Sequence, residues 1–225
     1  MAATVTGTEQ AVKTGVGGGP RPRNGNGFHK NGGGGDEIPF RFSPARYRIG
    51  VWAAVGSILM LFVALTSAFI VRSASANDWR PIVMPKILWL STALIVVSSV
   101  TIELSRRSLK RQNNPAYVRW LVNTLVLGGG FVASQLFAWR QLIRQGVYLA
   151  ANPYNSFFYL FTAAHGVHLL GGVAALAYLV ITTRAARTSV EGELRRVGSV
   201  EAVTIYWHFM DVLWIGLFLL LIFWK

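Results

Sequence analysis

The sequence contains no cysteine and few charged residues, and both shortages narrow the possible functions. Without cysteine, the chain has no disulfide bond, no thiolate metal ligand and no cysteine nucleophile. Charged residues make up 14% of the 225 residues, whereas soluble domains usually contain about 25%. Hydrophobic residues make up 52% of the chain, and many of them occur in long runs. The composition therefore indicates an integral membrane protein.

Five apolar runs are long enough to cross a membrane as helices. They cover residues 49–71, 86–104, 118–139, 155–183 and 198–224. A helix rises about 1.5 Å per residue, so roughly 20 apolar residues cross a hydrocarbon core of about 30 Å. The predicted fold class is therefore all-α, with five transmembrane helices in a domain that covers residues 41–225.

Acidic residues are scarcer than basic ones, 9 against 22, and the net charge is +13. The basic residues lie between the apolar runs rather than on one helix face, so we predict no nucleic-acid partner. Seven precede the first run, four lie between the second and third runs with a fifth, Arg119, at the start of the third, and four lie between the fourth and fifth, which makes 16 of the 22. Lys and Arg accumulate on the cytoplasmic side of a membrane. We therefore predict a cytoplasmic N-terminus and an external C-terminus.

Residues 1–40 differ from the rest because they contain 11 of the 23 glycines. Such a segment cannot bury enough apolar surface to offset the entropic cost of ordering the chain. We expect it to be a disordered cytoplasmic tail. Arg46 and Arg48 then precede the first apolar run, where they are candidates for contact with lipid headgroups.

Four ionisable residues lie inside the last two apolar runs. His165 and His168 belong to the fourth run, and His208 and Asp211 to the fifth. An ionisable group at membrane depth is costly unless it is paired or faces a protein interior. Residues three apart share one helix face, and the helical rise places the two pairs at overlapping depths. We predict a hydrogen bond between a histidine of the fourth helix and the Asp211 carboxylate.

Three hypotheses fit this cluster: a structural network between two helices, a proton relay, or a metal site built from three histidines and a carboxylate. The spacing differs from the metalloprotease motif, whose two histidines lie four residues apart around a catalytic glutamate. No nucleophile is paired with a histidine and a carboxylate on a polar loop. We therefore predict a structural network, with no metal ligand and no catalytic residue.

Two glycine clusters lie within the apolar runs, at residues 128–130 and 171–172. Small residues allow transmembrane helices to approach closely. We predict helix contacts at both clusters.

The segment 206–214 (YWHFMDVLW) resembles the signature of the last helix of subunit III of the haem–copper oxidases. The segment 157–172 (FFYLFTAAHGVHLLGG) resembles that family's penultimate helix, with its His-Gly-x-His core. Gln135 in the third run and the serines at 98–99 in the second also fit. The resemblance covers about residues 49–225, and five spans match the shorter bacterial form, which lacks the first two of seven helices.

The resemblance implies a non-catalytic subunit of an aerobic respiratory oxidase in the bacterial cytoplasmic membrane. Family members pack beside subunit I, in a complex with subunit II, and protect the core from inactivation during turnover. They also hold phospholipid in a cleft between a two-helix group and a three-helix group. We expect the haems and copper in the partner subunits and no cofactor in this chain, because it has too few histidines to hold them. The expected structural network comprises His165, His168, His208, Asp211, Trp207, Trp214 and Gln135.

Two positions depart from the family pattern. Many members carry a glutamate after the serine of the first of these five helices, and another three residues after the glutamine of the third. This chain has Ile58 and Ala138 at those positions. The electron donor implied by the resemblance is cytochrome c, with quinol as the alternative, and a larger respiratory supercomplex is a further candidate partner. Nitric oxide reductase accessory proteins are similar in length and motifs, and a small His-dependent metal carrier is an alternative of a different class.

Overall fold

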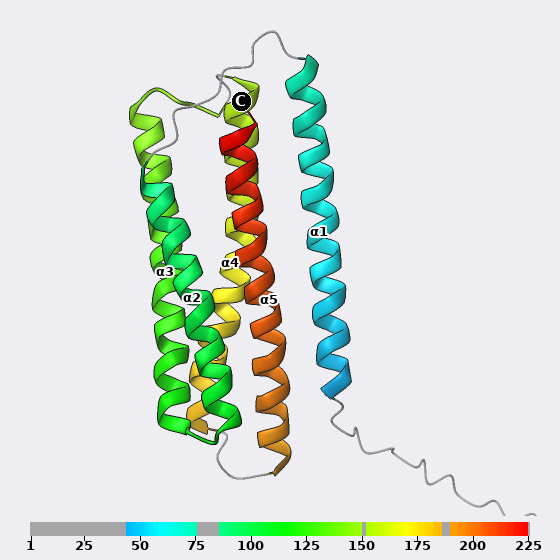
Figure 1. Ribbon diagram of the computed structural model, residues 1–225, viewed down its shortest axis with the longest axis vertical. Helices are drawn as coiled ribbons and strands as arrows, with labels where there is room; N and C mark the ends of the chain where they lie inside the picture. The colour runs from blue at the N-terminus through cyan, green and yellow to red at the C-terminus, as the bar shows by residue number, and fades with distance from the viewer. Residues whose placement is uncertain (1–43, 76–85, 150–151, 186–189, 225) are drawn as a thin grey trace, which may run out of the picture. The chain divides into compact units, whose positions relative to one another are not determined.

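The computed structural model describes residues 44–75, 86–149, 152–185 and 190–224 (Figure 1). These residues form five helices and no strand: α1 (Pro44–Ser75), α2 (Ile87–Lys110), α3 (Asn114–Arg144), α4 (Pro153–Ala185) and α5 (Val190–Phe223). All five are long and apolar enough to cross a membrane. The predicted all-α fold with five transmembrane helices is confirmed. The expected tail, residues 1–40, lies outside the described residues.

The helices are longer than the apolar runs that predicted them. For example, α2 continues to Lys110, and α3 extends from Asn114 to Arg144. An apolar run marks the hydrocarbon core only, whereas a helix continues into the headgroup region, where long basic side chains reach water. Only three residues then join α2 to α3. Asn113 caps α3 by accepting a hydrogen bond from the backbone N–H of Ala116 at 3.2 Å.

The five helices pack into one unit (Figure 1). The most extensive contact joins α2 to α3, and α1, α4 and α5 contact one another. The expected two-helix and three-helix groups are not separate, because α2 also packs along α5, and α3 along α4, so helices α2 to α5 surround a common core. The start of α1 and the end of α5 lie at opposite ends of the bundle (Figure 1).

The α2–α3 contact is made by small polar side chains. Three hydrogen bonds join the helices: Thr101 with Thr124 at 2.8 Å, Ser134 to Ser91 at 2.9 Å, and Ser105 to the carbonyl oxygen of Tyr117 at 3.1 Å. Such bonds contribute about 0.6 kcal/mol each within a membrane. The small size of these side chains matters as much as the bonds, because it lets the two helices approach closely.

In each glycine cluster, one glycine lies directly against the Trp207 indole. A Cβ atom on Gly128 would lie 2.7 Å from Cη2 of Trp207, and one on Gly172 would lie 3.2 Å from Cζ3 of the same indole. The predicted contacts are confirmed there, since Trp207 of α5 fills the space beside both glycines. Gly129 has no described atom within 4 Å of such a Cβ, and the nearest atom at Gly171 is 3.9 Å away. Those two positions tolerate a side chain.

Replacing Gly128 by alanine is predicted to destabilise the bundle, because the new methyl group overlaps the Trp207 indole. Overpacking of this kind costs about 1–3 kcal/mol. Thermal denaturation of the purified protein measures the effect, and Gly129→Ala on the same helix is the matched control. Equal stability of the two variants would contradict the packing of Trp207 against Gly128.

Candidate functional site

One face of α5 carries most of the residues singled out in the sequence. Trp207, Asp211 and Trp214 follow one another at intervals of four and three residues, so they form a stripe, with His208 beside it. Trp207 and Trp214 are fully buried, Asp211 is 3% exposed and His208 is half-buried. This stripe faces α2.

Three hydrogen bonds join the stripe to hydroxyl groups of α2. The indole N–H of Trp207 donates to Ser98 at 3.0 Å, and that of Trp214 donates to Thr92 at 3.1 Å. Nδ1 of His208 is hydrogen-bonded to the Ser99 hydroxyl at 2.7 Å. Without its partner, each of these polar groups would be buried in an apolar medium with no hydrogen bond, which costs free energy. Each bond therefore favours the docking of α5 on α2.

These hydroxyl partners are the functional residues that sequence reasoning missed. Ser98 and Ser99 belong to the family resemblance, whereas Thr92 is part of no motif described above. The signal that could have found them is periodic. Ser91, Ser98 and Ser105 recur every seven residues and are fully buried, and Thr92 and Ser99 beside them are also seven residues apart, so α2 presents a hydroxyl stripe of two adjacent rows to its neighbours.

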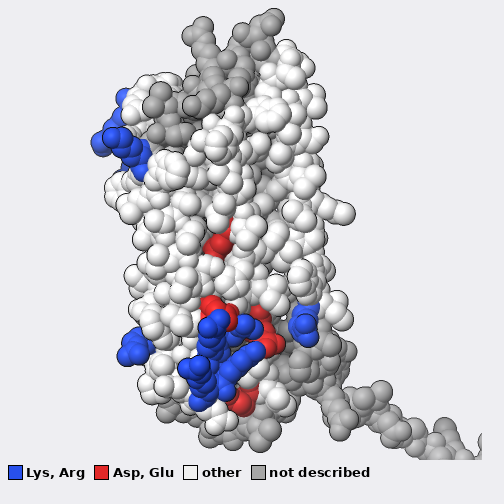
Figure 2. Space-filling view, viewed as in Figure 1, with Lys and Arg blue, Asp and Glu red and all other residues white. Residues whose placement is uncertain are grey.

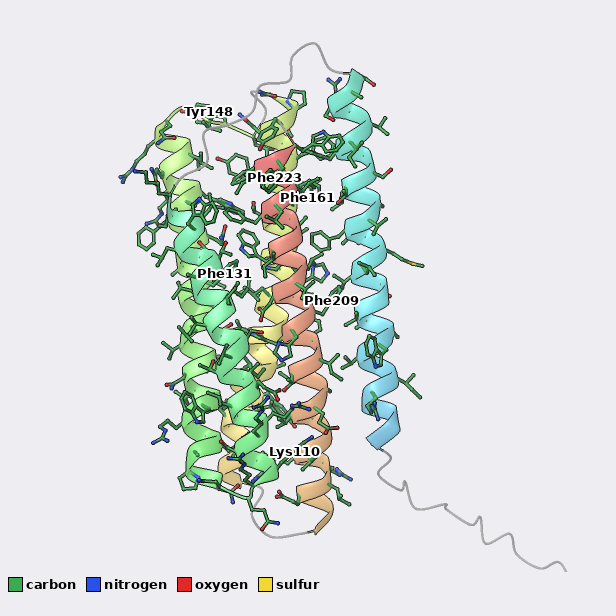
Figure 3. All side chains as sticks on the ribbon, viewed as in Figure 1. Lys110, Phe131, Tyr148, Phe161, Phe209 and Phe223 are labelled. Atoms are coloured by element: carbon green, nitrogen blue, oxygen red, sulfur yellow. The ribbon has the colours of Figure 1, made fainter. Side chains whose placement is uncertain are left out.

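His165 is placed differently from the prediction. Its imidazole is fully buried and packs against Phe131 of α3 and Trp214 of α5, with ring centroids 5.8 and 5.1 Å away. Neither ring nitrogen makes a hydrogen bond to any described residue. Figure 3 labels Phe131, which belongs to this buried aromatic group. His165 therefore contributes to the core as an aromatic ring.

His168 lies one turn further along α4 and faces α1. Its Nδ1 donates to the carbonyl oxygen of Ala164 in its own helix at 2.7 Å, and its ring packs edge-on against Phe62 of α1. The backbone carbonyl of His168 accepts a hydrogen bond from the Tyr206 hydroxyl of α5 at 2.8 Å. The contact between α4 and α5 at this level is thus made by Tyr206 rather than by Asp211.

The predicted hydrogen bond between a histidine of α4 and Asp211 is therefore wrong. Within the described residues, both carboxylate oxygens lack a hydrogen bond. The Ser99 hydroxyl is close enough to interact with Asp211, but the geometry falls short of a hydrogen bond. The helical rise gives the depth of each residue in the membrane, but it does not give the rotation of α5 about its own axis. In the structure, that rotation turns Asp211 toward α2.

Gln135 is the remaining member of the expected network. It is 9% exposed and lies one turn beyond Phe131 on α3, yet its amide makes no hydrogen bond within the described part of the chain. The seven residues therefore form three sets. Trp207, His208 and Trp214 are bonded to α2, whereas Gln135, His165 and Asp211 are buried without partners among the described residues, and His168 bonds to its own helix.

Charged residues gather at the end of the bundle where α2 finishes (Figure 2). Glu103 accepts hydrogen bonds from Arg106 at 2.8 and 2.9 Å and from Arg107 at 2.9 Å. Lys110 pairs with Glu201 of α5 at 3.7 Å. Lys110 marks this end of the bundle in Figure 3, and Tyr148 marks the opposite end.

Two hollows lie between this charged end and His208. The first, of about 400 Å³, is lined by Arg48, Glu103, Arg106, Glu201, Thr204, Ile205 and His208. The second, of about 350 Å³, is lined by Ser99, Val100, Glu103, Leu104, Arg107 and His208. Arg48, a candidate for lipid contact, is exposed at the mouth of the first hollow. Arg46 lies outside the residues whose side chains the structure describes.

Comparison with known proteins agrees with this architecture. The family model for cytochrome c oxidase subunit III matches residues 44–225, which include all five helices. The chain belongs to this family. It is therefore a non-catalytic, multi-pass membrane subunit of a haem–copper oxidase, which assembles with partner subunits. Subunit III of this family carries no redox cofactor of its own.

Individual relatives support the same assignment. A probable cytochrome c oxidase subunit 3 of Nocardia farcinica is 32% identical over 179 residues, which cover 78% of this chain and 86% of the relative. The cytochrome c oxidase subunit 3 of Corynebacterium diphtheriae is 28% identical over 187 residues, 80% of this chain and 89% of the relative. The quinol oxidase subunit 3 of Bacillus subtilis is 25% identical over 173 residues, 76% of this chain and 83% of the relative.

The two positions that depart from the family pattern are buried and apolar. Ile58 of α1 is 8% exposed and Ala138 of α3 is fully buried. Within the described residues, Asp211 is therefore the carboxyl group that lies deep in the subunit III bundle, while Glu103 and Glu201 lie nearer its charged end. The described residues also contain no cluster of three or more His, Cys, Asp or Glu side chains suited to a metal ion.

Removing the Ser98 hydroxyl is predicted to destabilise the subunit, because the buried indole N–H of Trp207 then loses its acceptor. The expected loss is about 1 kcal/mol of unfolding free energy, measured by thermal denaturation of Ser98→Ala. Ser57→Ala is the control, since the exposed Ser57 hydroxyl bonds only to the carbonyl of Ala53 in its own helix. A Ser98→Ala variant as stable as the control would mean that the Trp207–Ser98 bond contributes nothing.

Proposed function

We propose that this chain is subunit III of a bacterial cytochrome c oxidase, in the cytoplasmic membrane, where it contacts subunit I directly in a complex that also contains subunit II. The family match across all five helices carries the proposal. The choice of donor rests on the relatives. The Nocardia protein, whose name specifies cytochrome c oxidase, is 32% identical, against 25% for the quinol oxidase subunit of Bacillus subtilis. Quinol is accordingly the second candidate.

The proposed role is to stabilise subunit I during turnover. The bundle suits this role because side-chain hydrogen bonds join its neighbouring helices: α2 to α3, α2 to α5, α3 to α4 and α4 to α5. Large apolar side chains are exposed on all five helices. In a membrane such faces meet either acyl chains or the helices of a partner subunit.

The proposed orientation puts the charged end of the bundle in the cytoplasm. Arg48, Arg106, Arg107 and Lys110 lie at that end, together with the start of α1. This distribution of positive charge supports a cytoplasmic N-terminus and an external C-terminus.

Phospholipid is proposed to bind in a groove between α1 and α5. The groove has a volume of about 590 Å³, and its lining is almost entirely apolar. Phe62 and Ile70 of α1 face Phe209 and Leu217 of α5 across it. Figure 3 labels Phe209 on the side of α5 that is turned toward α1. An acyl chain fits this lining. Arg48 lies outside the groove, 11 residues before its first lining residue on α1, and is proposed separately as a contact for a lipid phosphate at the charged end.

Affinity purification of the tagged chain in mild detergent tests the proposed complex. We expect a haem- and copper-containing partner to co-purify, and the complex to oxidise reduced cytochrome c faster than quinol. Rapid quinol oxidation without cytochrome c oxidation would support the second candidate. Recovery of the chain with no haem–copper partner would overturn the proposal.

Filling the groove is predicted to displace the lipid. A Cβ atom on Gly216, which lines the groove on α5, meets no described atom within 4 Å, so Gly216→Leu occupies the groove without a clash. Mass spectrometry of the purified complex should show at least one phospholipid fewer per complex. Gly56→Leu is the control, because Gly56 of α1 is equally open but lies outside the groove. The same lipid content in both variants would place the lipid elsewhere.

A further inference from the structure

Asp211 is a carboxyl group that the packing of the bundle does not use. It is 3% exposed, and within the described residues no donor forms a hydrogen bond to either oxygen. A carboxylate without donors is costly in a medium of low dielectric constant. The group therefore needs either a proton or water molecules, and both must come from an aqueous phase.

Within the described residues, two hollows lead from the aqueous phase at the charged end of the bundle toward Asp211. The two hollows between the charged end and His208 share Glu103 and His208 in their linings. Ser99 lines the second hollow and is hydrogen-bonded to His208. The same hydroxyl lies beside Asp211. Along α2, the polar residues from Lys110 to Ser99 span about 16 Å of helix, roughly half of the hydrocarbon thickness.

We propose that α2 and α5 enclose a hydrated crevice that opens at the charged end of the bundle, and that Asp211 exchanges protons with water through His208 and Ser99. A proton passes from water to the His208 imidazole and from there to the Ser99 hydroxyl, which rotates toward Asp211 and gives its own proton to the carboxylate. The net transfer is one proton from water to Asp211, and no other reactant is needed. The site differs from the lipid groove, which lies between α1 and α5.

Several charged groups face this path and set its electrostatic field. From α2 these are Glu103, Arg106 and Arg107; from α5, Glu201; and from α1, Arg48. From α4, His165 packs on Trp214, the Tyr154 hydroxyl donates to the carbonyl oxygen of Leu221, and the backbone of His168 accepts from Tyr206. Both carboxylates of the crevice are paired with basic side chains, and basic side chains are in excess at its mouth.

The absence of cysteine makes a direct test of hydration possible, because a single introduced thiol is the only one in the chain. Ser99→Cys is treated, in the intact complex in membrane vesicles, with a water-soluble thiol reagent that does not cross membranes. Val97→Cys is the matched control, since Val97 lies two residues away on α2 and is exposed on the outer face of the bundle. We expect labelling of Ser99→Cys from the charged side and none of Val97→Cys. Equal labelling of the two variants, or labelling of Ser99→Cys only from the opposite side, would overturn the crevice.

Infrared spectroscopy of the intact complex tests the proton exchange. A protonated Asp211 gives a carboxylic C=O band that shifts when H₂O is replaced by D₂O, and Asp211→Asn removes this band. Ser99→Ala and His208→Phe should slow the shift while the band remains. A complex without a band assignable to Asp211 would overturn the proposal, and so would exchange at an unchanged rate in both variants.

Discussion

The bundle depends on one buried side chain, the indole of Trp207. It belongs to α5, lies against Gly128 of α3 and Gly172 of α4, and donates a hydrogen bond to Ser98 of α2. One residue therefore contacts the three helices that surround the core with α5. A tryptophan buries a large apolar area, and its N–H requires an acceptor. Burial of the indole against the two glycines fixes how closely α5 approaches α3 and α4. The hydrogen bond of its N–H to Ser98 fixes how α5 is rotated relative to α2.

The number and class of the helices could be predicted from the sequence, whereas the partners of the buried polar groups could not. A spanning helix is apolar on most of its circumference, so its hydrophobic pattern does not reveal which face meets which neighbour. The depths of His165 and Asp211 along their helices were not sufficient to pair them. The rotation of α5 is set by Trp207 and turns Asp211 to α2, whose hydroxyl stripe was the informative signal. Gly128 and Gly172 could be predicted as contact points because glycine weakens a helix, and a close helix neighbour compensates for that cost.

Two kinds of buried polar residue result from this arrangement. Trp207, Trp214 and His208 are bonded to α2 and hold the bundle together. Asp211 and Gln135 are buried without a hydrogen bond among the described residues, so their desolvation is not offset by a bond that stabilises the fold. Residues of the second kind are expected where function rather than stability selects them. A non-catalytic subunit of a haem–copper oxidase can thus combine a hydrogen-bonded core with buried polar groups that do not stabilise the fold.

The proposed role of stabilising the complex depends on the packing of Trp207. The most direct measurement is the number of turnovers that the assembled oxidase completes before it loses activity, with Trp207→Leu compared with wild type. Trp52→Leu is the control, because Trp52 of α1 is 58% exposed. We predict that the initial rate of oxygen consumption is unchanged in both variants and that the number of turnovers falls only in Trp207→Leu. If Trp207→Leu completes as many turnovers as wild type, the protective role of this packing is contradicted.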